Sequence, residues 1–183
     1  FNPGSTMAAD PAAISHVVIT TTMAAAAAIM SSTIISWILL GKPDLGMTLN
    51  GCLAGLVAIT ASCAFVSISS SLIIGLIAGI LVVLSVICFD RARIDDPVGA
   101  LSVHLANGIF GTICVGLFAQ DKITGTATGN GLFFGGGAKL LLTQLTGVLT
   151  VGMFTFFAAL TGWLIIKKLI GIRVSLREEI EGL

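Results

Sequence analysis

Four long stretches of this chain contain no charged residue, and this feature restricts the possible folds more than any other. They cover residues 11–41, 45–89, 97–120 and 140–166. About 20 apolar residues in an α-helix, rising about 1.5 Å each, are enough to cross the hydrocarbon core of a bilayer. Only 10% of the residues are charged and 56% are hydrophobic, which is too little polar surface for a soluble protein. We therefore predict an all-α integral membrane protein.

The second stretch is too long for one membrane helix, and a polar run at residues 67–71 interrupts it. Dividing the stretch there predicts five transmembrane helices in the whole chain. Their approximate ranges, followed by that of a carboxyl-terminal tail, are residues 12–40, 48–66, 70–89, 97–118, 140–170 and 171–183.

The basic residues fall unevenly on the two sides of this five-helix arrangement. One side carries only Lys122 and Lys139. The other side carries all the rest, namely Lys42, Arg91, Arg93, Lys167, Lys168, Arg173 and Arg177. Because Lys and Arg are enriched in cytoplasmic loops, the second side is predicted to be cytoplasmic, together with the carboxyl terminus. The formal net charge is zero, so we expect no nucleic-acid partner.

Neither the cysteines nor the glycine-rich loop predicts a cofactor. Cys52, Cys63, Cys88 and Cys114 lie inside apolar segments and form no C-x-x-C pair, which favours packing over a metal site or a disulfide. Residues 120–139, an expected outer loop, lack the Gly-Lys-Ser/Thr ending of a phosphate-binding loop. We therefore expect no metal and no cofactor. The sequence opens without a basic segment or an initiator methionine, which indicates a start internal to a longer protein.

Glycines four residues apart occur in two of the predicted membrane helices. Gly51 and Gly55 form one pair, and Gly75 and Gly79 form the other. In lipid, small residues at this spacing let two helix backbones approach closely and gain dispersion contact. Both pairs therefore predict tight helix packing.

His104 is the residue that most strongly indicates a function. It lies seven residues after Pro97, well inside a predicted span, where an ionisable side chain is costly and usually functional. Gly108 and Gly111 follow at helical spacing and are expected to leave room beside the imidazole. The alternative is a histidine held by an interhelical hydrogen bond. His16, near the start of the first span, is interpreted as an interfacial or packing histidine.

The charged segment before the fourth span ends in Asp95, Asp96 and Pro97. An aspartate followed by proline is typical of an N-cap and the first position of a helix, so the fourth span is expected to begin here. The two aspartates are therefore interpreted as structural residues, with a gating or regulatory role as the alternative.

Four separate sequence strings resemble the ammonium transporter (Amt/Mep/Rh) family. They are FNPGS at residues 1–5, NGCLAGLVAITA at residues 50–61, DDPVGA with the following VH at residues 95–104, and REEIEGL at residues 177–183. The resemblance covers essentially the whole chain, and the strings follow the family's order. It implies an eleven-helix protomer that assembles as a homotrimer with one pore per subunit. This chain would hold the last five helices and would not conduct alone.

The resemblance also implies roles for individual residues. Phe1 matches the family's inner aromatic gate, and Ser5 matches the hydroxyl of its outer recruitment site. His104 matches the second of two paired pore histidines, the first of which is not in this chain. Typical members follow the pore histidine with glycine and carry cysteine three positions on, whereas this chain has Leu105 and Asn107.

The function implied by the resemblance is transport of ammonium or ammonia across the plasma (inner) membrane through a hydrophobic pore. The alternative is an ammonium sensor in which the same fold is fused to a signalling domain. A PII-type signal protein is a further expected partner. A membrane enzyme with His104 as general base is the third class considered. It is not favoured, because no intramembrane Asp, Glu or Cys lies near that histidine in the sequence.

Overall fold

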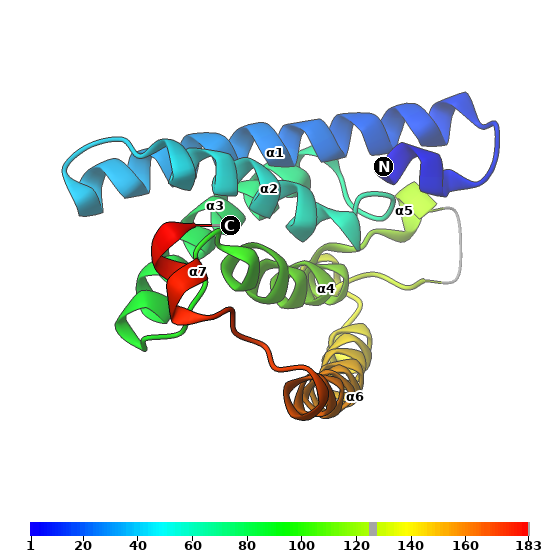
Figure 1. The fold of residues 1–183 in the computed structure, drawn as a ribbon. Helices are drawn as coiled ribbons and strands as arrows, with labels where there is room; N and C mark the ends of the chain where they lie inside the picture. The colour runs from blue at the N-terminus through cyan, green and yellow to red at the C-terminus, as the bar shows by residue number, and fades with distance from the viewer. Residues whose placement is uncertain (125–127, 183) are drawn as a thin grey trace. The chain divides into compact units, whose positions relative to one another are not determined.

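The computed structural model describes residues 1–124 and 128–182, and all the regular structure in them is helical (Figure 1). The predicted all-α fold is therefore confirmed for these residues. The chain divides into two compact units, Phe1–Leu145 and Thr146–Leu183. Part of the predicted outer loop and the last residue of the tail lie outside the described residues. In chain order the elements are η1 (Asn2–Thr6), α1 (Pro11–Leu40), α2 (Leu45–Thr60), α3 (Ile68–Arg91), η2 (Leu101–Ala106), α4 (Asn107–Phe118), α5 (Asp121–Thr124), η3 (Leu132–Phe134), α6 (Lys139–Leu169) and α7 (Leu176–Glu181).

Four helical segments among the described residues are long and apolar enough to cross a membrane. They are Pro11–Leu40, Ile68–Arg91, Leu101–Phe118 and Lys139–Leu169. The remaining apolar helix, Leu45–Thr60, has 16 residues and is shorter than a usual span. These five helices occupy the segments in which membrane helices were expected. That each of them crosses the bilayer stays a prediction.

Polar caps define where the helices begin. Asp10 accepts hydrogen bonds from the backbone N–H groups of Ala12 and Ala13 at the start of α1, and Asp44 accepts one from Met47 in α2. The serine run expected to separate the second and third spans behaves differently. Only Ser67 stays outside the helix, as the N-cap of α3, while the serines after it belong to α3. The break therefore lies earlier, between Thr60 and Ser67.

The two glycine pairs pack α2 and α3 closely against α1. A Cβ added at Gly55 of α2 would lie 2.6 Å from the Cβ of Ala28, and one added at Gly75 of α3 would lie 2.8 Å from the Cα of Ala24. Gly51 and Gly79 are equally close to the same face of α1. Carbon atoms in ordinary contact are about 3.5–4.0 Å apart, so only glycine allows these backbone approaches. The predicted tight packing is confirmed.

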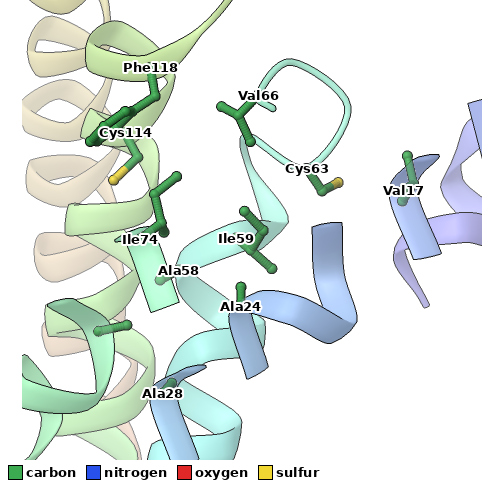
Figure 2. Close-up of a cluster of buried hydrophobic side chains, with 11 residues drawn as sticks. Val17, Ala24, Ala28, Ala58, Ile59, Cys63, Val66, Ile74, Cys114 and Phe118 are labelled. Carbon is green, nitrogen blue, oxygen red and sulfur yellow. The ribbon is translucent and has the colours of Figure 1, made fainter. Parts of the chain in front are cut away.

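The fourth apolar segment packs against this three-helix layer through α2. Gly111 of α4 is buried, and a Cβ there would lie 2.8 Å from the Cα of Ala58. Figure 2 shows the hydrophobic cluster that results from these contacts. Its members come from all four helices and include Ala24, Ala28, Ala58, Ile59, Ile74, Cys114 and Phe118.

Candidate functional site

The amino-terminal segment places Phe1 and Ser5 on the surface of the described residues. Residues Asn2–Thr6 form the short 3₁₀ helix η1, which packs against α1. Asn2 is buried, and its Nδ2 donates to Oγ1 of Thr21, 3.3 Å away. Phe1 is 99% exposed, and the Ser5 hydroxyl is also exposed and donates only to the Phe1 carbonyl, 3.4 Å away. Both side chains are therefore free to contact groups beyond this chain.

A pocket of about 690 Å³ lies between η1, the first turns of α1 and the segment after α2. Its polar lining comes from Asn2, Ser5, Thr6, Asp10, His16 and Thr60. Neither Phe1 nor His104 lines it. The structure therefore brings Ser5 together with His16 and Asp10, and this pocket does not include the other two predicted pore residues.

The break between α2 and α3 leaves backbone carbonyls in an apolar setting, and side chains from α1 satisfy two of them. Nε2 of His16 lies 3.0 Å from the Val66 carbonyl oxygen. Because a carbonyl oxygen only accepts, this nitrogen carries the hydrogen. Oγ1 of Thr20 donates to the Cys63 carbonyl, 2.9 Å away. An unpaired carbonyl is costly in a membrane interior, so His16 has a structural contact, as the sequence analysis expected.

His104 lies in η2, a π-helical turn that leads directly into α4. The side chain is exposed and makes no hydrogen bond to the described residues, whereas its neighbour Val103 is 2% exposed. The alternative interpretation, a histidine held by an interhelical hydrogen bond, is therefore not observed within the part of the chain that the structure describes. The imidazole is presented outward from a helix of membrane length.

Asp96 caps this helix from a distance, and the helix begins later than expected. Gly99 adopts a φ of +75°, which turns the chain so that the helix starts after it and not at Pro97. The Asp96 carboxylate accepts hydrogen bonds from the Leu101 N–H at 3.0 Å and from the N–H and hydroxyl of Ser102, both at 3.1 Å. Burial raises the pKa of Asp96, but these donors outweigh it and hold the pKa below its ordinary value.

Asp95 and Pro97, on either side of Asp96, are exposed in the described residues. Asp95 accepts no hydrogen bond there, unlike Asp96, so the two aspartates that the sequence presented as a pair have different surroundings. Only Asp96 holds the helix start.

The two glycines that follow His104 also differ. A Cβ added at Gly108 would meet only Cγ1 of Val57, at 3.9 Å, which is an ordinary contact. Gly111 is in close contact with the backbone of α2 through Ala58. Gly111 thus has a packing role between α4 and α2 that the spacing alone did not indicate, and it faces different surroundings from the exposed His104.

Neither the π turn nor the contact that Asn107 makes within it was expected from the sequence. The Asn107 side chain is fully buried, and its Nδ2 donates to the Ser102 carbonyl, 2.9 Å away. The available signal was an asparagine three residues after the pore-type histidine in an otherwise apolar helix. Among the described residues there is no group of three or more His, Cys, Asp or Glu side chains that could hold a metal ion.

The apolar, membrane-length helices of this chain define a polytopic α-helical membrane protein. The sequence model of the Ammonium Transporter Family matches residues 1–183. The chain belongs to this family, and the resemblance found in its motifs is confirmed. It is 40% identical to the ammonium transporter Amt2 of Archaeoglobus fulgidus, over 100% of the chain and 40% of that protein.

Solved structures agree with this assignment. The chain is similar to a structure named Sensor Amt Protein, with a TM-score of 0.88 and 35% identity over 99% of this chain and 43% of that one. It is also similar to Mep2 of Saccharomyces cerevisiae, with a TM-score of 0.82 and 26% identity over 90% of this chain and 38% of that one. The chain thus spans less than half the length of these relatives.

Proposed function

We propose that the protein containing this chain transports ammonium or ammonia across a membrane, and that His104 lines its pore. The observation that carries the proposal is the outward imidazole on a membrane-length helix, without a hydrogen-bond partner among the described residues. A polar ring facing lipid would be costly, whereas a ring facing a narrow conduit has a use. Membership of the Ammonium Transporter Family and the names of the relatives support ammonium as the substrate.

The proposed mechanism follows from the cost of moving a cation through an apolar channel. An ammonium ion would lose several kcal/mol of hydration on entry, so it must shed its proton or be relayed in parts. At the outer end the exposed Ser5 hydroxyl can accept a hydrogen bond from the ion. Phe1 below it can exclude water and larger solutes. Farther along, His104 can exchange a hydrogen bond or a proton with neutral ammonia or with a second histidine.

The segment Asp95, Asp96 and Pro97, which precedes η2, is proposed to hold the inner end of this pore helix through Asp96. Support comes from the three hydrogen bonds that Asp96 accepts at the first turn. Gly108, where an added Cβ would meet only Cγ1 of Val57 at 3.9 Å, is proposed to keep the conduit beside His104 wide enough for a small solute. Gly111 contributes by letting α4 lie against α2.

The assembly and location of the complete protein are also proposals. Family membership supports a homotrimer in the plasma (inner) membrane, with the lipid bilayer around it and a PII-type protein as a partner on the inner side. The excess of Lys and Arg on one side of the helices supports a cytoplasmic carboxyl terminus.

The experiment that tests the pore assignment is methylammonium uptake by the full-length protein with His104→Ala. Loss of the titratable ring should change the uptake rate, or its selectivity against alkali cations, by about tenfold or more. Ile80→Ala, an exposed position on α3, is the control and should stay near the wild-type rate. Uptake and selectivity that both remain at the wild-type level in His104→Ala would count against a pore role.

An ammonium sensor with the same fold is the second candidate. Its specific support is the similarity to the structure named Sensor Amt Protein, with a TM-score of 0.88. The two functions differ in the sequence that accompanies this chain in the full-length protein. A kinase or cyclase module whose activity follows ammonium concentration would favour the sensor, and methylammonium uptake without such a module would favour the transporter.

A further inference from the structure

We propose that Asn107 is a positioning residue: its side-chain amide holds the π turn that sets the direction of the His104 ring. This inference rests on the proposed function insofar as it concerns transport, but its structural part can be tested without transport. It assigns a role to a buried polar residue that faces away from the exposed imidazole.

The local backbone carries the first step. Leu101–Ala106 is π-helical, and the chain returns to an α-helix at Asn107. In a π turn, backbone hydrogen bonds reach the carbonyl five residues back, and such turns are rare and are often found at functional sites. His104 lies in the middle of this turn, so its direction depends on whether the turn persists.

The contacts of Asn107 support the turn. Its backbone N–H is directed to the His104 carbonyl, and its side-chain Nδ2 donates to the Ser102 carbonyl, 2.9 Å away and five residues back. The side-chain amide thus extends the five-residue pattern of the π turn by one hydrogen bond, at the step where the helix changes type. No apolar side chain of similar size can replace this donor.

Burial shows that packing alone does not explain an asparagine here. The side chain is 0% exposed, and its Oδ1 accepts no hydrogen bond from the described residues. A buried polar atom without a partner is costly, and leucine would fill the same space without that cost. The residue is therefore better explained by the hydrogen bond that it donates than by the space that it fills.

The first residues of the turn and the helix that follows it are held independently. On one side, Asp96 caps the first residues of η2, and Val103 is buried among Ala54, Val82 and Val83. On the other side, Gly111 packs against α2. Between these two contacts the π turn takes up an extra residue. If the π turn relaxed to an α turn, the residues before it would rotate by about 100° about the helix axis relative to those after it. The His104 side chain would then point in a different direction.

The structural test is cryo-electron microscopy of the full-length protein with Asn107→Leu, which keeps the approximate volume and removes the donor. We expect the π turn to be lost and the His104 ring to rotate or to become disordered. Ile74→Ala, a change in the buried cluster that contains no residue of the turn, should leave both unchanged. A variant with the π turn intact and His104 in its original direction would overturn the inference.

A second pair of variants keeps the test decisive if Asn107→Leu does not fold. Asn107→Gln and Asn107→Met have side chains of similar length, and only glutamine keeps the amide donor. The π turn should persist in Asn107→Gln and be lost in Asn107→Met. The same backbone in both variants would contradict the role assigned to the amide.

Methylammonium uptake by the same variants separates this inference from the proposed function. A misaligned pore ring should lower uptake per folded protein by about tenfold to a hundredfold in Asn107→Leu, and Asn107→Gln should recover most of it. Rotation of His104 with unchanged uptake would support the positioning role and contradict the pore assignment. Lost uptake with an unmoved ring would contradict the positioning role and leave the pore assignment standing.

Discussion

The two histidines show how the same residue type is used in opposite ways. His16 is half-buried and donates to the carbonyl of Val66 across the break between two helices. His104 is exposed on a membrane-length helix and bonds to no described residue. The spacing of residues in the sequence could not separate a structural histidine from a functional one, because both histidines lie in apolar segments. The structure explains His16, since the broken segment after α2 presents backbone carbonyls that need hydrogen-bond donors and His16 supplies one of them.

Asp96 provides a test at the residue scale. Because hydrogen bonds hold its pKa below the ordinary value of 3.8, its stabilising effect is fully present above that value and is lost as the pH falls through the lower folded-state pKa. Asp96→Asn should therefore lower the free energy of unfolding at pH 7 by about 0.3–1 kcal/mol, because the amide oxygen can still cap the helix but the negative charge at its N-terminus is lost. Thermal unfolding of the detergent-solubilised full-length protein, followed from pH 7 to pH 3, measures this difference.

The control for this test is Asp95→Asn, because Asp95 is exposed and accepts no hydrogen bond among the described residues. The difference between wild type and Asp96→Asn should narrow below about pH 3.8, whereas Asp95→Asn should follow the wild type throughout. A gap between wild type and Asp96→Asn that does not change with pH would show that the carboxylate charge is not what holds the helix start.

At the scale of elements, α1 is the helix around which the first unit is built. Its small residues Ala24, Ala28, Ser31 and Ser32 lie against glycines of both α2 and α3. Hydrophobic burial does not drive helices together in lipid, so close backbone contact must supply the attraction. That requirement explains why the buried residues of α1 are alanine, serine and threonine, with one valine, and not leucine.

Gly75→Ala tests this packing. The new methyl group would overlap the backbone of Ala24 in α1, and overpacking of this kind typically costs about 1–3 kcal/mol. The matched substitution Gly147→Ala, in α6, meets no described atom within 4 Å and should be neutral or slightly stabilising, because alanine favours helix. Thermal unfolding of the two full-length variants should therefore shift in opposite directions or by clearly different amounts. Equal shifts would contradict the close α1–α3 contact.

At the scale of the whole molecule, this chain spans less than half the length of the relatives that it matches. Its helix α6 has no residue buried by the described part of the chain, although it carries many large apolar side chains. Phe1, Ser5 and His104 are exposed in the described residues, and Phe1 and His104 do not line the pocket that Ser5 lines. A conduit with these residues on its wall needs further helices of the protomer.

We therefore predict that residues 1–183, produced alone, do not conduct. Methylammonium uptake in cells without their own ammonium transporters should stay at background for this polypeptide, and the full-length protein should restore it. Insertion of the shorter polypeptide into the membrane must be verified by fractionation. Uptake by residues 1–183 that His104→Ala abolishes would contradict this prediction.

The candidate site was predictable only in part, for a physical reason that applies residue by residue. An ionisable group in an apolar segment is visible in the sequence alone, so His104 was singled out as a candidate, and its pore role stays a prediction. The contacts of Gly111 with α2 and of Asn107 with Ser102 did not follow from the sequence, because they depend on which neighbour lies beside each residue. The helix start at Asp96 was recognised as a cap, but Gly99, with its positive φ, moved the first turn beyond Pro97.

The sequence by itself determined that this is a membrane protein and that its fold is all-α. Uncharged stretches of this length can satisfy their backbone groups in lipid only as helices, and glycines four apart can serve only close packing there. Only the tertiary structure decided which polar side chains make hydrogen bonds within the chain and which are exposed. His16 donates a hydrogen bond to the Val66 carbonyl across the break, and Asn107 donates one to the Ser102 carbonyl within the π turn. Both bonds depend on the distance and direction between groups in the folded chain, which the spacing of residues in the sequence does not specify.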